Sequence, residues 1–277
     1  MNSTRMIHLV FIVIIVLALV ISYSGIAAQN NRLSKEIEEL FEFSGDISSR
    51  TFDYDQLKDL PEPVQNYFRY ALKEGQPYIS YVRLKHRGFF KTAKDKKWTK
   101  IKGEQYFTAQ EPGFLWKGKT SLFTARDMYI GGRGRLVVAL FSLFKVVDET
   151  GAHLDQAELL RWLGESIWFP TNLLPSDRLK WTSLNDHSAR VTLSYKEMSV
   201  YYDVTFNEKG EIVKLETERF MEKGKKEKWI GKVGGYNLYN GVRIPTTIKA
   251  TWKLKEGDYP YADFKLETIE YDIPGKF

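Results

Sequence analysis

Val82-Arg-Leu-Lys-His-Arg-Gly-Phe-Phe90 is the stretch that indicates the fold, because apolar and polar side chains alternate along it. Val82 and Leu84 fall on one face and the basic residues between them on the other, as in an antiparallel strand with one buried side. The same period of two recurs over residues 98–109, 114–117, 126–130, 191–195, 198–206, 212–220, 229–233, 248–254 and 264–266. Turn-forming Asn, Gly and Asp residues separate several of these runs. The sequence therefore predicts a long antiparallel meander.

Two segments before the first strand have the pattern of helices instead. Residues 30–43 place apolar side chains on one stripe, with Ser34 as a candidate N-cap. Residues 60–72 carry Pro63 where the first helical turn would lie, a position at which proline loses no needed hydrogen bond. Both segments are predicted as short amphipathic helices.

The middle of the chain interrupts the meander with two further helix-like pieces, residues 136–147 and 155–168. The second has Asp155 as a candidate N-cap, followed three residues later by a glutamate, which is the pattern of a capping box. Neither a Gly/Ser linker nor an exact repeat divides the chain. The sequence thus predicts a mainly β (α+β) fold, with a single β-rich domain over residues 55–277 and a helical insertion at about residues 136–170.

The N-terminus is strongly apolar. Residues 6–28 contain no Asp, Glu, Lys or Arg, and this length is enough to span a bilayer as a helix. Arg5 precedes the run, so the N-terminus is expected on the cytoplasmic side. Residues 1–28 are therefore interpreted as a signal anchor, or as a signal peptide cleaved near Ala28. The remaining domain would be extracytoplasmic and anchored, or secreted or periplasmic after cleavage, with residues 29–54 as an amphipathic stalk or linker.

Composition excludes several classes of function. The 277 residues include no cysteine, which rules out disulfides, thiolate metal sites, a cysteine nucleophile and a lipid-modified cysteine. The net charge of +6 could favour an anionic membrane surface, but a solvated basic face is the preferred explanation. No nucleic-acid-binding motif accompanies the charge, so no nucleic-acid partner is predicted.

No catalytic, metal or cofactor motif survives inspection. Residues 113–120 match the expression of a phosphate-binding loop, but they lie in a predicted hairpin and carry bulky Phe114, Leu115 and Trp116. The glycines at 131, 132 and 134 could form an anion nest or a plain turn from strand to helix. The four histidines are far apart in sequence, so no metal site and no cofactor are predicted.

A candidate binding site lies in the middle of the chain. Arg161 and Glu165 are four residues apart on one predicted helix, either as a surface ion pair or at the mouth of a cavity. Residues 136–147 are apolar on most sides, so they are either buried between layers or line an acyl-chain site. The candidate cavity residues are Leu140, Phe141, Phe144, Trp162, Trp168 and Phe169, and the candidate charged mouth comprises Arg126, Asp127, Arg161 and Glu165.

The order of several motifs resembles an uncharacterised bacterial family that is known only as a domain of unknown function. The resemblance covers most of residues 55–272 and is carried by Leu60-Pro-Glu-Pro-Val64, Tyr67, residues 83–88, Trp116, residues 126–129, Gly151, residues 161–165 and 168–171, Trp181 and Gly241-Val-Arg-Ile-Pro245. It implies a lipoprotein-carrier (LolA-like) fold: a strongly curved antiparallel sheet or half-barrel wrapped around a few helices, here preceded by one hydrophobic helix. A long N-terminal apolar segment is unlike a freely diffusing carrier, which argues against a shuttle.

Three functions are consistent with these observations. The leading hypothesis is an exported or membrane-tethered binding module that holds a lipid or other hydrophobic ligand in a sheet-enclosed cavity. A structural or interaction domain of the cell envelope is the second. An envelope hydrolase is the third, and it would use the charged residues named above. Since no catalytic signature is present, the sequence favours a binding module over an enzyme, with the membrane as partner through residues 6–28.

Overall fold

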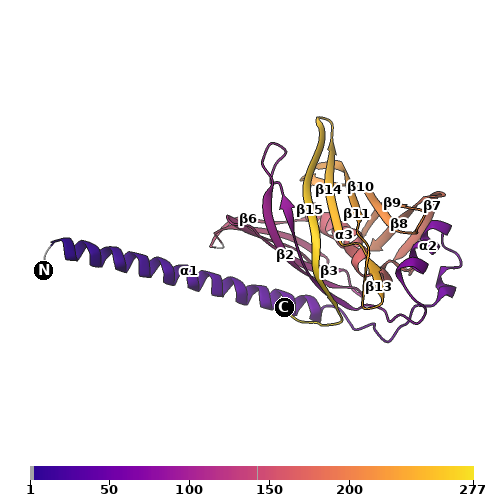
Figure 1. Ribbon diagram of the computed structural model, residues 1–277, viewed down its shortest axis with the longest axis horizontal. Coiled ribbons are helices and arrows are strands. Elements are labelled where there is room, and N and C mark those ends of the chain that lie inside the picture. Colours follow the sequence, from indigo (N-terminus) through magenta and orange to yellow (C-terminus); the bar gives the residue numbers. More distant parts are fainter. Residues whose placement is uncertain (1–2, 142) are drawn as a thin grey trace.

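A computed structural model describes residues 3–141 and 143–277, except for the side chains of residues 3–10, 14–15 and 17–22. One antiparallel sheet of 13 strands dominates it, in the order β6-β5-β4-β3-β2-β1-β15-β14-β11-β10-β9-β8-β7 (Figure 1). A separate two-stranded ribbon, β12–β13, lies outside this sheet. The predicted mainly β fold is confirmed.

The strands follow the alternating runs of the sequence closely. They are β1 (Tyr81–Phe90), β2 (Thr99–Thr108), β3 (Gly113–Lys119), β4 (Phe123–Ile130), β5 (Arg133–Leu140), β6 (Phe144–Thr150), β7 (Leu179–Asn185), β8 (Ser188–Tyr195), β9 (Met198–Phe206), β10 (Ile212–Glu222), β11 (Lys225–Gly234), β12 (Asn237–Tyr239), β13 (Val242–Ile244), β14 (Thr247–Leu254) and β15 (Gly257–Tyr271). The helices are α1 (Ser3–Glu42), α2 (Glu62–Ala71) and α3 (Ala152–Glu165), with short 3-10 turns η1 (Tyr54–Leu57), η2 (Ser166–Trp168) and η3 (Pro170–Leu173).

The sheet consists of two meanders that meet at the last strand. Strands β1 to β6 form one half in sequence order, and β7 to β11 with β14 form the other. The halves join because β15 pairs with β14 on one side and with β1 on the other, for example through Val82 and Tyr271. The sheet is open, since β6 and β7 are its two edge strands.

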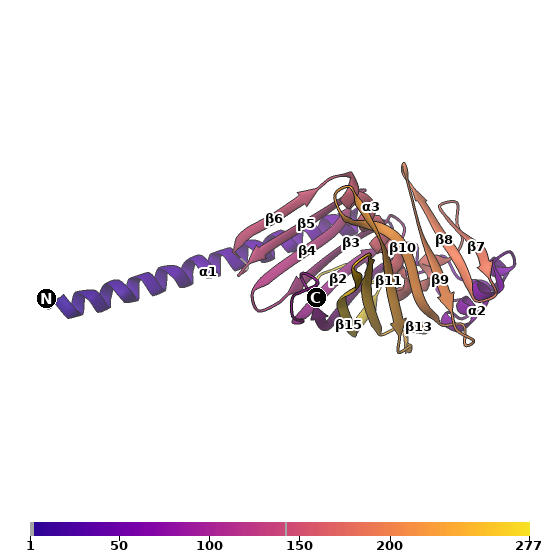
Figure 2. The same ribbon diagram turned by 90° about the horizontal axis from the view of Figure 1, so that it is seen from above.

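Helix α3 lies on the inner face of the sheet, between the two halves (Figure 2). It contacts β3–β6 of the first half and β9 and β10 of the second. Gly151 with φ 129° is its N-cap, so the predicted cap at Asp155 is wrong; the Asp155 carboxylate instead accepts a hydrogen bond from the Gly134 amide at 2.7 Å. Helix α2 begins with a proline in its first turn, as predicted.

Helix α1 lies on the outer face of the sheet. Leu33, Ile37 and Leu40, spaced by four and three residues, are buried on one stripe of the helix. They pack against outward-facing side chains of β2, β3 and β4, namely Tyr106, Leu115 and Met128. The helix is continuous from Ser3 to Glu42, so Ser34 lies inside it and is not an N-cap; its hydroxyl donates to the Asn30 carbonyl at 3.1 Å.

The predicted helix over residues 136–147 is wrong. Those residues form the end of β5, a turn and the start of β6, with Val138 paired to Val147 across the hairpin. Both faces of β5 carry apolar side chains. In a short run that is apolar throughout, the spacing of the apolar residues does not distinguish a strand from a helix. Consequently, the helical insertion is limited to α3 and the 3-10 turns after it.

In the part of the chain whose side chains are described, no helix has an apolar stretch long enough to cross a bilayer. Most residues of the predicted anchor, residues 6–28, have side chains that lie outside the described part of the structure.

Candidate functional site

Three of the predicted charged residues come together beneath α3. The Arg161 guanidinium donates to the Asp127 carboxylate at 2.5 Å and to the Glu165 carboxylate at 3.0 Å. The other Glu165 oxygen accepts from the Gln105 amide at 2.6 Å. The guanidinium also lies over the Trp116 ring, 5.1 Å from its centroid. Arg161 therefore joins α3 to the inner faces of β2, β3 and β4.

The fourth predicted residue, Arg126, lies on the opposite face of the sheet. Successive side chains on a strand point to opposite faces, so Arg126 and Asp127 on β4 cannot share one site. Arg126 pairs with Glu36 of α1, where both side chains are largely buried. Its contact fixes α1 to the outer face.

Two charged residues that sequence reasoning missed extend the inner cluster. Glu158, one turn before Arg161 on α3, is 4% exposed. Arg219 of β10 donates to the Ala157 carbonyl at 3.2 Å and lies between the rings of Trp229 and Trp252. Within the described residues, Glu158 Oε2, Asp127 Oδ1 and Arg219 Nε have no hydrogen-bond partner. Glu158 precedes Arg161 by three residues, a spacing that puts both side chains on one face of a helix. This spacing was the sequence feature from which Glu158 could have been added to the site.

Burial governs the protonation of this cluster. It raises the pKa of Glu158 well above its ordinary value, and the nearby Asp127 carboxylate raises it further. Burial also raises the pKa of Glu165, against the opposing effect of Arg161. With Glu158 neutral, the positive charges of Arg161 and Arg219 balance the negative charges of Asp127 and Glu165. Charges enclosed away from water need this kind of pairing. Glu158 is itself part of α3 and is almost fully buried, and the cluster links α3 to both halves of the sheet through Asp127 and Arg219.

Glu158→Gln is expected to stabilise the protein increasingly as pH rises from about 4.5 to 8. Above its unfolded-state pKa, Glu158 releases its proton on unfolding but keeps it when folded, so the native chain loses stability with rising pH. Glutamine carries no such proton, so the stability advantage of the variant is expected to grow as pH rises through this range. Urea denaturation of both proteins at several pH values measures the difference. Glu208→Gln, on the exposed turn between β9 and β10, is the matched control, and an equal gain there would contradict the assignment.

The predicted apolar cavity residues divide into two separate groups. Trp162, Trp168 and Phe169 belong to the core, where the indoles of Trp162 and Trp168 donate to the Thr108 and Pro245 carbonyls at 2.8 and 3.1 Å. In contrast, Leu140, Phe141 and Phe144 are 40%, 63% and 66% exposed at the turn between β5 and β6. The six residues therefore do not line one cavity, because 136–147 is a hairpin and its turn points away from the core.

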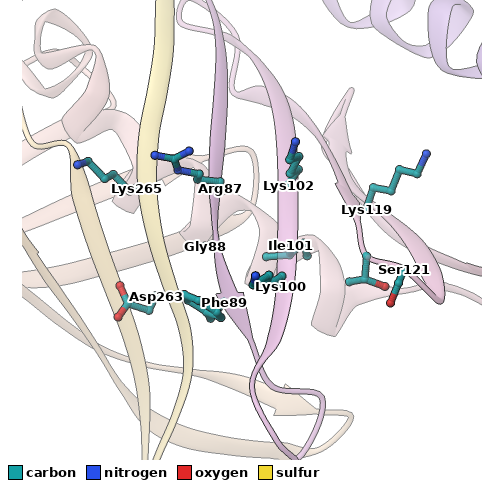
Figure 3. Close-up of a pocket in the computed structure, with 11 residues that line it drawn as sticks. Arg87, Gly88, Phe89, Lys100, Ile101, Lys102, Lys119, Ser121, Asp263 and Lys265 are labelled. Atoms are coloured by element: carbon teal, nitrogen blue, oxygen red, sulfur yellow. The ribbon is translucent and has the colours of Figure 1, made fainter.

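A cavity of about 740 Å³ lies on the outer face of the sheet, where β15, β1, β2 and the end of β3 are neighbours (Figure 3). Its apolar floor includes Phe89, which is partly exposed, whereas the Ile101 side chain belongs to the core on the inner face and only its backbone borders the cavity. The charged side chains that line it are five basic and one acidic: Arg87, Lys100, Lys102, Lys119, Lys265 and Asp263. Asp263 is paired with Lys249 at 3.0 Å and Arg87 with Glu267 at 3.3 Å. Lys100, Lys102, Lys119 and Lys265 have no ionic partner within the described part of the chain.

This basic cavity was not predicted from the sequence. Lysines at every second position of a strand are typical of a solvated face, and the sequence shows them at 100 and 102. Only the pairing of β1 with β15 brings Lys265 beside Arg87. Concerning metals, no three ligating side chains come together in residues 3–141 and 143–277. The chemistry that the cavity offers is attraction of an anionic group above an apolar floor.

The sequence matches the model of a family of unknown function (DUF6544) over residues 50–264. The chain belongs to this family. The DUF6544 region starts after α1 and ends within β15, so it contains α2, α3 and the strands that carry the basic cavity, except for the end of β15. The predicted resemblance to a family of unknown function is thus confirmed.

Two solved structures are similar to the chain at low sequence identity. A LolA superfamily protein from Nitrosomonas europaea is 12% identical, with a TM-score of 0.42 over 75% of this chain and 91% of its own. A "putative outer membrane lipoprotein-sorting protein domain" from Vibrio parahaemolyticus is 10% identical, with a TM-score of 0.39 over 70% of this chain and 86% of its own. No curated protein matches the DUF6544 chain in sequence.

Proposed function

We propose that the protein is a membrane-tethered binding module of the cell envelope that holds an anionic amphiphile, such as a lipid with a phosphate headgroup. The observation that carries this proposal is the outer-face cavity, which combines an apolar floor with four lysines that lack ionic partners. Phosphate oxygens are good acceptors for lysine ammonium groups, and an acyl chain is compatible with the exposed ring of Phe89 and the aliphatic stems of the lysines. The proposal thus keeps the lipid ligand of the sequence-based hypothesis. It moves the ligand from the inside of the sheet to the cavity on its outer face.

The tether is proposed from the sequence of α1. Residues 6–28 are uncharged and follow Arg5, which supports an N-terminal anchor with the domain on the extracytoplasmic side. The helix continues without a break into the stripe that packs on the outer face, the same face as the basic cavity. An anchor of this kind places the cavity near the lipid headgroups from which a ligand would come.

The charge-reversed variant Lys100→Glu/Lys102→Glu is expected to retain at least tenfold less anionic lipid than the natural chain. Each lysine near an anionic surface contributes about 1 kcal/mol, so reversing two lysines replaces attraction by repulsion. The full chain is purified in nanodiscs of phosphatidylcholine and phosphatidylglycerol, transferred to detergent, and the retained lipids are quantified by native mass spectrometry.

Lys180→Glu/Lys209→Glu is the control, because both lysines are exposed and lie outside the cavity. The control is expected to retain phosphatidylglycerol normally, and phosphatidylcholine retention is expected to be equal in all three proteins. If the natural chain retains no anionic lipid, or if the cavity variant retains as much, the lipid-binding proposal is wrong. An interaction domain of the envelope, tested by capture of a protein partner, would then be the better hypothesis.

A further inference from the structure

We propose that two neighbouring turns of the domain insert into the headgroup region of the bilayer beside the anchor helix. The inference rests on the proposed tether and adds a second, separate membrane contact. We call these turns the turn patch, defined as Leu122 between β3 and β4 together with Leu140, Phe141, Phe144 and Val146 between and within β5 and β6. All five side chains are exposed, by 40% to 66%.

The two turns that carry the turn patch are joined to each other through their backbones. The Phe141 amide donates to the Leu122 carbonyl at 2.8 Å, which ties the two turns together. Within the second turn, the Leu143 amide donates to the Leu140 carbonyl at 2.9 Å. Soluble surfaces rarely hold so many large apolar side chains side by side, and such patches mark contacts with membranes or other proteins.

The patch lies where α1 leaves the domain. Both views show the ends of β3–β6 beside the helix, which then projects beyond the sheet (Figures 1 and 2). The Leu143 side chain fills the space next to Gly25, where a Cβ would meet it. Ile26 of α1 and the turn residues Leu122 and Phe141 also line a cavity of about 330 Å³ between helix and turns. The turns therefore contact the helix directly through Leu143 and Gly25, and the remaining space between them is lined by both apolar and polar side chains.

The length of α1 places this junction at the membrane surface. Residues 6–24 extend for about 28 Å at 1.5 Å per residue, close to the hydrocarbon thickness of about 30 Å. The uncharged run ends at residue 28, and contact with the domain already begins at residue 25. Because the helix is continuous through this point, no flexible spacer separates the domain from the bilayer. A spanning α1 thus brings the turns to the depth of the headgroups.

The charges around the turn patch are compatible with lipid headgroups. Residues 118–125 and 136–147 contain no acidic residue, and each segment contains one lysine, Lys119 and Lys145. Asp148, which pairs with Lys145 at 2.6 Å, is further along β6 and is also held by Arg135. Phenylalanine and leucine beside lysine are typical of segments that lie in the membrane interface.

The natural chain lacks cysteine, so single cysteines can report the depth of each site without any background. Phe144→Cys and Leu122→Cys test the turn patch, and Leu184→Cys, an exposed leucine on β7, is the matched control. Val13→Cys, on the exposed side of α1, tests the tether itself. Each full-length variant is labelled with a polarity-sensitive fluorophore in vesicles of phosphatidylcholine and phosphatidylglycerol. Quenching by lipids that carry a nitroxide near the headgroup or deep in the acyl chain is then measured.

Labels at residues 144 and 122 are expected to be quenched severalfold more by the shallow nitroxide than the label at residue 184. The label at residue 13 is expected to be quenched more by the deep nitroxide. Quenching at residue 13 with none at residues 144 and 122 would overturn the docking but leave the tether intact. No quenching at residue 13 would overturn the tether and the docking with it. A blue-shifted label at residue 144 without lipid quenching would mean that a second copy covers the patch, which also overturns docking.

Discussion

Arg161→Met is expected to lower the free energy of unfolding by about 3–5 kcal/mol. Arg161 is the partner of Asp127 and Glu165, and both carboxylates lie beneath α3 with little access to water. Removal of the cation leaves two adjacent enclosed carboxylates without compensation, so they must take up protons or bring water into the core. The midpoint of urea unfolding, followed by tryptophan fluorescence in mild detergent, measures the loss.

Arg190→Met is the matched control for this experiment. Arg190 forms an equally well-aligned pair with Asp203, with bonds of 2.7 and 2.9 Å, but its side chain and that of Asp203 are 39% and 34% exposed. A pair that water screens in this way contributes about 0–1 kcal/mol. Equal losses for the two variants would show that the inner cluster is solvated and is not a buried junction.

Phe169→Ala is expected to cost a further large amount, about 3–5 kcal/mol. Phe169 is fully buried, and its ring centroid lies 5.2 Å from that of Phe107 and 6.4 Å from that of Trp162. Truncation removes these ring contacts and leaves a cavity between the 3-10 turns and β2. Thermal and urea unfolding of the full chain measure the change.

Comparison of Phe169→Ala with Phe144→Ala distinguishes a role in core packing from a role in ligand binding for the predicted cavity residues. Phe144 is exposed at the β5–β6 turn, so its loss is expected to change stability by no more than about 0.5 kcal/mol. A residue that lined a ligand cavity would behave differently: its truncation would reduce lipid retention and leave the ligand-free protein stable. If Phe169→Ala behaves in that way, the inner face and not the outer cavity holds the ligand.

The strands were predictable because one face of each is buried and the other is solvated. In β1 and β9 the side chains alternate between core and solvent almost without exception, and the sequence shows that period directly. The hairpin of β5 and β6 was not predictable in this way. Val137 and Val138 are both apolar although they point to opposite faces, so the period of two disappears from the sequence. The valines themselves, which favour strands, were the remaining signal.

The charged site was predictable only as far as one helix reaches. Arg161 and Glu165 are neighbours on any helix, so their pairing follows from sequence spacing. Their contact with Asp127 depends on which face of β4 points inward, and that depends on the register of the sheet. Arg219 joins the charged cluster only because β10, in the second half of the sheet, packs against α3. Contacts of this kind between distant segments have no local pattern from which they could be inferred.

The position of β15 at the centre of the sheet bears on the order in which the chain can fold. During synthesis or translocation, β1 emerges early but its partner β15 is among the last segments to appear. Until then the first meander has an unpaired inner edge at β1, in addition to its permanent edge at β6. Such non-local pairing slows folding and leaves strand edges open to wrong partners. A nascent chain of this topology would benefit from a chaperone at the exit site, and loss of its last 20 or so residues would separate two half-sheets instead of trimming an end.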